Sequence, residues 1–123
     1  MKEYADKHVK FHLETPSSAS IVIVFQGKST AEGMEIFFQW VEEEIDRVGV
    51  GNLSVLLDLQ QLVSIPLSIQ MKMASWILRV KNTLFKVAVV GGGRSAKLLV
   101  KGAKMSTILF FDSRLKAESW LAA

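Results

Sequence analysis

The stretch SIVIVFQ, residues 20–26, decides the fold. Its five consecutive apolar residues are mostly β-branched, which is typical of a strand covered on both faces. Gly27 ends this strand, and Ser29 or Thr30 then caps a long helix that has Glu32 in its first turn. A doubly covered strand followed directly by a helix predicts an α/β protein with a mostly parallel sheet.

The pattern of apolar residues extends this prediction in both directions along the chain. Residues 7–14 alternate between apolar and polar side chains, which predicts a half-buried edge strand that forms a hairpin with residues 20–26. Further strands are predicted at residues 53–57, 86–90 and 107–111, and further helices at residues 67–82, 95–105 and 114–121. We therefore expect one domain over residues 1–123, with a single five-stranded mixed, mostly parallel sheet and four helices in the order β-β-α-β-α-β-α-β-α.

Two segments in the second half of this pattern are similar to a known family. KVAVVGG (residues 86–92) before a helix, followed by ILFFDSRLKAESWLA (residues 108–122), resembles the carboxyl-terminal half of the SpoIIAA-like family, which is related to STAS domains. VLLDLQQL (residues 55–62) resembles the family's central strand and ends it at Asp58. The resemblance implies the SpoIIAA-like fold.

The resemblance implies two kinds of activity. STAS domains of the anti-sigma-factor-antagonist type carry Asp-Ser-Ser-Gly after the central strand, and phosphorylation of a serine switches partner binding. The matching positions here are Pro66-Leu67-Ser68-Ile69, which retain only Ser68 and argue against this switch. The other branch resembles CRAL-TRIO lipid carriers, which hold an apolar ligand between helices and sheet.

The predicted helix at residues 67–82 has more apolar surface than one sheet can cover. One apolar stripe has Leu67, Met71, Ala74 and Leu78, and a second has Ile69, Met73, Trp76 and Val80, with Ile77 between them. An amphipathic helix needs an apolar arc of about 100°, and this arc is roughly twice as wide. Because Ala74 allows close approach to the sheet, we expect the first stripe to face inward and the second to face outward.

The outward stripe is the candidate binding surface. Leaving such side chains uncovered would cost about 1.5–3 kcal/mol each, so we expect an apolar ligand, a lipid surface or another protein to cover them. Ile36 and Trp40 also lie outside the apolar stripe of their own helix. The predicted ligand- or membrane-binding residues are therefore Ile69, Met73, Trp76, Ile77, Val80, Ile36 and Trp40.

Basic residues flank this candidate surface. Residues 62–123 carry ten Lys or Arg and two Asp or Glu, and Lys72 and Arg79 adjoin the outward stripe, as expected for a helix at an acidic membrane. A glycine-rich turn before the helix at residues 95–105 could hold an anion on backbone N–H groups. The predicted residues of this anion site are Gly92, Arg94, Lys97 and Lys101. Basic and aromatic residues are not interleaved, so nucleic acid is not an expected partner.

No pattern of residues indicates catalysis. The two histidines, His8 and His12, have no accompanying set of metal ligands, and the absence of cysteine excludes thiol chemistry and fits a reducing compartment. We expect no cofactor, no metal and no enzymatic activity, and a location in the cytoplasm or at the membrane surface.

Two functions remain open from the sequence. The first is a non-catalytic protein that binds an apolar, lipid-like ligand or an acidic membrane surface through helix 67–82. The alternative is a STAS-type regulatory module that uses the same helix as an interface with a partner or with a second copy of the chain.

Overall fold

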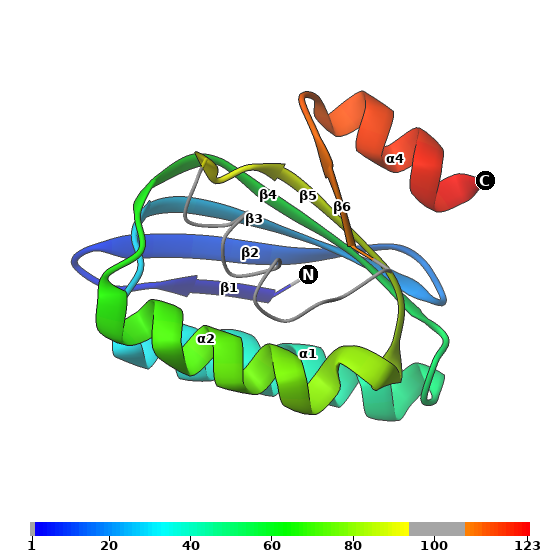
Figure 1. Cartoon of the computed structure of the whole chain (residues 1–123), viewed down its shortest axis with the longest axis horizontal. Helices are drawn as coiled ribbons and strands as arrows, with labels where there is room; N and C mark the ends of the chain where they lie inside the picture. Colours follow the sequence, from blue (N-terminus) through cyan, green and yellow to red (C-terminus); the bar gives the residue numbers. More distant parts are fainter. Residues whose placement is uncertain (1, 94–107) are drawn as a thin grey trace.

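A six-stranded sheet forms the centre of the molecule (Figure 1). The computed structural model describes residues 2–93 and 108–123. The strands are β1 (Lys2–Ala5), β2 (Val9–Ser17), β3 (Ser20–Lys28), β4 (Leu53–Ser64), β5 (Leu84–Gly91) and β6 (Ile108–Phe111), and they lie side by side in chain order. β1, β2 and β3 pair antiparallel, and β3 to β6 pair parallel. This arrangement confirms the predicted mixed sheet of an α/β protein.

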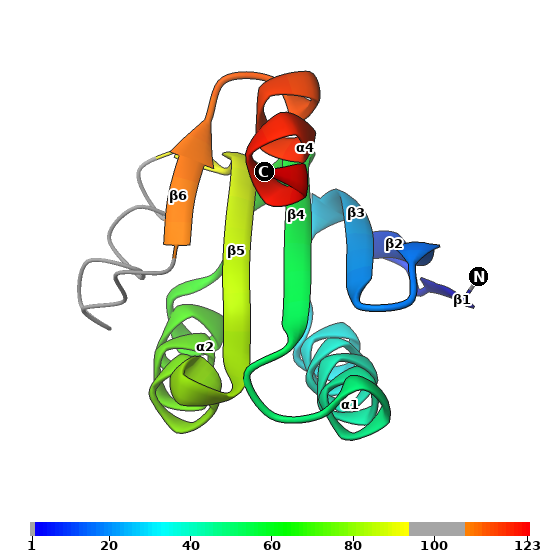
Figure 2. The same ribbon diagram turned by 90° about the vertical axis from the view of Figure 1, so that its right-hand side faces the viewer.

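Helices cover the two faces of the sheet unequally. α1 (Ala31–Val48) and α2 (Leu67–Val80) lie side by side on one face, and a short 3-10 helix (Lys81–Thr83) links α2 to β5. Of the three α-helices in residues 2–93 and 108–123, only α4 (Arg114–Ala122) lies on the other face, above β4 and β5 (Figure 2). Each sheet face therefore has its own apolar cluster, and the larger one lies under α1 and α2.

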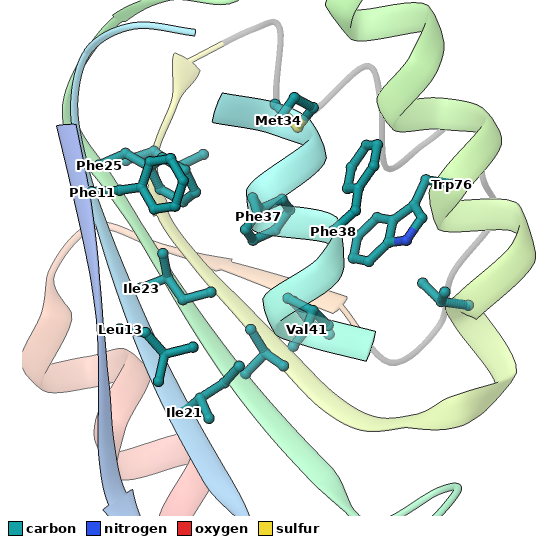
Figure 3. Close-up of a cluster of buried hydrophobic side chains, with 14 of the residues drawn as sticks. Phe11, Leu13, Ile21, Ile23, Phe25, Met34, Phe37, Phe38, Val41 and Trp76 are labelled. Atoms are coloured by element: carbon teal, nitrogen blue, oxygen red, sulfur yellow. The ribbon is translucent and has the colours of Figure 1, made fainter. Parts of the chain in front are cut away.

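β3 shows why the sequence specifies two covered faces. Ile21, Ile23 and Phe25 point into the cluster under α1 and α2, where they meet Phe37 and other aromatic residues (Figure 3). Val22 points the opposite way, into the cluster beneath α4. Because side chains alternate along a strand, the continuous apolar run fills both clusters, as predicted.

The sheet has one strand more than the five predicted, because β1 was not expected. β1 was missed because its sequence, KEYA, offers only Tyr4 to the core, where the ring stacks on Phe11 at a centroid distance of 5.0 Å. Too few residues alternate there to give a periodic signal. The described residues form three α-helices, and the predicted helix at residues 95–105 lies outside them.

The central strand β4 is longer than predicted. It continues past Asp58 to Ser64 because Gln26, Gly27 and Lys28 of β3 pair with its second half. Asp58 is therefore not at the strand end. Its carboxylate accepts hydrogen bonds of 3.1 Å from the backbone and side-chain nitrogens of Gln60, which is a local structural role.

Asp6 joins the β1–β2 turn to the start of α1. The Thr30 hydroxyl, which also caps α1 by accepting from Gly33 N, donates to Asp6 Oδ2 over 2.6 Å. The backbone N–H groups of His8 and Val9 donate to Asp6 Oδ1 over 2.8 and 2.9 Å. These hydrogen bonds, that of Thr30 above all, hold the pKa of Asp6 well below its usual range.

We predict that Asp6→Asn reduces the loss of stability in acid. A carboxyl group with a pKa lowered by folding stabilises the native state above its unfolded pKa of about 3.9, and this contribution disappears as the pH falls toward the folded value. Urea denaturation between pH 2 and pH 6 should give a flatter pH dependence for Asp6→Asn than for the wild type. Glu3→Gln, which removes an exposed carboxylate from β1, is the matched control and should keep the wild-type slope. An unchanged slope for Asp6→Asn would contradict the role of this carboxylate.

Candidate functional site

The buried face of α2 is the one predicted to be exposed. Ile69, Trp76 and Val80 have exposed fractions of 5–6%, and Met73 and Ile77 are half-buried against the same apolar cluster. The prediction that Ile69, Met73, Trp76 and Val80 face outward is therefore wrong, and Ile77, predicted between the two stripes, lies on the buried side with them. They belong to the core between α2, α1 and the sheet.

The aromatic residues of α1 give the physical reason for this orientation. The indole ring of Trp76 stacks on Phe38 with a centroid distance of 4.4 Å and an interplanar angle of 15°, and it meets Phe37 edge-on at 5.4 Å (Figure 3). Such pairs add about 0.5–1.5 kcal/mol to the energy of burial. The stripe containing Ala74 has no residue of comparable size to offer α1.

The opposite stripe of α2 is exposed as a consequence. Leu67, Met71 and Leu78 have exposed fractions of 71%, 65% and 52%. We call these three residues the exposed α2 stripe. The prediction that α2 has more apolar surface than its own domain covers holds, but the two stripes exchange places.

The basic residues beside α2 are paired with α1. Lys72 Nζ lies 4.0 Å from Glu35 Oε1, and Arg79 Nη2 donates to Glu42 Oε1 over 3.2 Å. The two contacts link the exposed edges of two neighbouring helices, and α1 itself carries six acidic residues and one arginine. Lys72 and Arg79 therefore do not form a free cationic surface.

The two residues of α1 outside its apolar stripe, Ile36 and Trp40, are partly covered. Trp40 meets Phe11 of β2 edge-on at a centroid distance of 5.1 Å, and Lys2 Nζ of β1 lies 5.8 Å from the centroid of its ring. Ile36 is half-buried and packs against the larger apolar cluster. Neither residue is a fully exposed apolar side chain.

A small cavity lies between α2 and the sheet. It has a volume of about 60 Å³, and Met73, Trp76, Ile77 and Val80 are among its apolar lining residues. Ligand pockets usually have volumes of about 300–1,000 Å³. Trp76 Nε1 is buried without a hydrogen-bond partner among the described residues. The cavity is therefore far too small for a lipid chain.

The predicted anion site is only partly within the described residues. Gly92 has φ of +82°, a left-handed conformation that glycine adopts without strain. Arg94, Lys97 and Lys101 lie outside the described residues, so this site stays a prediction. Within residues 2–93 and 108–123, no helix has the length and hydropathy to cross a membrane, and no group of three or more metal-binding side chains is present.

A comparison with protein families agrees with this order of elements. The SpoIIAA-like family model matches residues 20–122, which is most of the chain. The chain belongs to the SpoIIAA-like family, as its second half had suggested. Comparison with curated protein sequences gives no match.

Solved structures share the whole fold at low sequence identity. An uncharacterised protein of the DUF3478 family from Shewanella loihica PV-4, described as having a SpoIIAA-like fold, is 20% identical with a TM-score of 0.71 and covers 96% of this chain and 98% of its own. An anti-sigma factor antagonist from Mycobacterium paratuberculosis is 13% identical with a TM-score of 0.64, covering 97% and 98%. The phosphorylated Bacillus cell fate determinant SpoIIAA is 9% identical with a TM-score of 0.64, covering 90% and 98%. These likenesses establish the common fold.

We predict that Trp76→Ala and Met71→Ala have very different effects on stability. Trp76→Ala should lower the free energy of unfolding by about 3–5 kcal/mol because it empties a buried aromatic site. Met71→Ala should change it by no more than about 0.5 kcal/mol because Met71 is exposed. Urea denaturation of both variants measures the two values. If Met71→Ala lowered the free energy of unfolding more than Trp76→Ala does, α2 would have the opposite orientation.

Proposed function

We propose that this chain is a non-catalytic regulatory module that binds a partner protein through the exposed α2 stripe. The observation that carries the proposal is the high exposure of Leu67, Met71 and Leu78 along a single helix face. An ordered row of uncovered apolar side chains is the kind of surface that a partner helix or groove covers. Two of the structural neighbours are named as anti-sigma factor antagonists or as SpoIIAA. By this likeness, we infer an anti-sigma factor as the partner.

The charge around the stripe favours a protein over an acidic membrane. Lys72 and Arg79 are engaged by Glu35 and Glu42, and the remaining exposed carboxylates of α1 lie on the same side of the sheet. An anionic lipid surface would be repelled by this helix pair. A protein can present apolar residues to the stripe and basic residues to α1.

The cavity beneath α2 weighs against a lipid carrier. Its volume of about 60 Å³ is a small fraction of what a lipid-like ligand needs. Binding of a lipid would require α2 to leave the sheet, which would expose Trp76 and break its contacts with Phe37 and Phe38. An exposed α2 stripe, in contrast, is available without rearrangement.

The proposed partner binding does not depend on serine phosphorylation. Ser68 lies exposed in the first turn of α2, but Pro66 and Ile69 stand where the phosphorylated family motif has its aspartate and its glycine. Ile69 is buried, so this turn is fixed to the core on one side. We infer that partner concentration, rather than a covalent switch, governs this interaction.

We predict that the double variant Leu67→Glu, Met71→Glu weakens binding to an anti-sigma factor by at least about tenfold. Burying two such side chains contributes about 1.5–3 kcal/mol each, and 1.4 kcal/mol corresponds to a factor of ten in the dissociation constant. Isothermal titration of the purified full chain with the anti-sigma factors of its source organism measures this change.

Leu115→Glu provides the matched control for this prediction. Leu115 is 74% exposed on α4, on the other face of the sheet, so the substitution makes the same chemical change away from the proposed interface. Equal weakening by both variants, or binding to none of the anti-sigma factors, would contradict the proposal. Sedimentation should give a monomer, and a tight dimer broken by the double variant would assign the stripe to a second copy instead. Flotation of the wild type with acidic liposomes would assign it to a membrane.

A further inference from the structure

A second surface feature lies on the sheet face opposite α1 and α2. α4 covers β4 and β5 there, and in the described part of the chain no helix covers β2 and β3 (Figure 2). The space between α4 and the β2–β3 hairpin is a groove of about 780 Å³. This volume lies within the range of about 300–1,000 Å³ that is usual for small-molecule sites.

The middle of the groove is apolar. Val22 and Leu56 form its buried floor, and Leu121 of α4 forms part of one wall. Phe85 also lines the groove and is 52% exposed. The pairing of β4 with β5 skips Phe85, since Leu53 pairs with Leu84 and Ser54 with Lys86, and such a bulge changes the direction of a side chain. The groove therefore offers an aromatic ring to the body of a ligand.

Ser54 supplies a polar group at the floor. Ser54 is 8% exposed and lines the groove on the same side of β4 as Leu56. Its backbone N–H donates to Ala19 O over 2.9 Å, and its side chain lines the groove. A hydroxyl on the wall of a groove is a polar contact that a ligand can complete.

One end of the groove has an excess of negative charge. Arg114 Nε donates to Glu118 Oε1 over 2.8 Å, and Arg114 Nη2 lies 3.7 Å from Glu14 Oε2. His12 Nε2 lies 3.0 Å from the same oxygen of Glu14. A single arginine thus stands between two carboxylates, and each carboxylate has its second oxygen outside these contacts. The free acceptors at this end favour a cation.

We propose that the groove binds a small amphipathic amine. Its ammonium group lies beside Arg114, at the second oxygens of Glu14 and Glu118. Its apolar body lies over Val22 and Leu56 beside Phe85, and a second N–H or hydroxyl reaches Ser54. This site lies on the face opposite the exposed α2 stripe, so it does not depend on the proposed partner binding.

NMR titration of the full chain with n-hexylamine, n-hexanoate and n-hexanol tests this proposal. The three probes share the same apolar chain and differ in the charge of the headgroup. We expect hexylamine to bind at least about tenfold more tightly than hexanoate, with the methyl signals of Val22 and Leu56 shifting most. Equal or tighter binding of hexanoate, or shifts centred on α2, would overturn the proposal.

Variants of the groove and of the opposite face distinguish the site from general attraction by charge. Glu14→Gln and Glu118→Gln should each weaken hexylamine binding about tenfold, the loss expected for one charge-assisted hydrogen bond. Ser54→Ala should weaken a probe with a second polar group, 6-amino-1-hexanol, more than it weakens hexylamine. Glu35→Gln makes the same charge change beside α2 and should leave binding unchanged.

Leu121→Trp keeps the proposal testable if the glutamine variants loosen α4. It leaves both carboxylates in place and puts a larger side chain beside the apolar floor, so it should weaken hexylamine binding. Wild-type affinity in this variant, or equal weakening by Glu35→Gln and Glu118→Gln, would overturn the proposal. Binding of a lysine-containing peptide at the groove without binding of hexylamine would also overturn it, since the occupant would then be a polypeptide.

Discussion

The stacking of Trp76 on Phe38 is the contact on which the arrangement of this molecule depends. It joins α2 to α1 above the sheet and fixes the rotation of α2 about its own axis. With that rotation fixed, Ile69 and Val80 enter the core, and Leu67, Met71 and Leu78 face outward. The same rotation brings Lys72 and Arg79 to the acidic edge of α1. The candidate partner surface and its electrostatic surroundings therefore follow from one aromatic contact.

The two faces of the sheet provide different kinds of surface. Two parallel helices close one face and leave a convex apolar stripe on the outer side of α2, which suits a protein partner. One short helix covers the other face incompletely and leaves a concave groove beside β3. Arg114 holds α4 beside β2 through Glu14, so the charged end of this groove is also part of the attachment of α4 to the sheet. The proposed partner surface and the groove thus lie on opposite faces of the sheet.

Most of the fold could be predicted because its elements have strong local signals. The continuous apolar run of β3 and the Thr30 cap of α1 are short-range patterns that identified these elements. The segments at residues 55–62, 86–92 and 108–122 led to the correct family. The candidate site could be predicted only in part. The surplus apolar surface of α2 was recognised, but its orientation was not, since both stripes of the helix are apolar. The cover that Lys2 of β1 gives to Trp40 was not foreseen, because the four residues of β1 have almost no pattern. The groove was not anticipated, since it joins residues of β2, β4 and α4 that are distant in the chain.

The sequence by itself determined the kind of elements, their order and the presence of more apolar surface than α2 can bury. These properties depend on the period of apolar residues and on caps and turns, which act over a few positions. Only the tertiary structure decided which stripe of α2 is exposed, how far β4 extends and where an open groove remains. Each of these depends on contacts between distant segments: Trp76 with Phe38, the second half of β4 with the end of β3, and Arg114 with Glu14. Local periodicity specifies that a helix has an apolar face, whereas the shape and size of its neighbours select which face is buried.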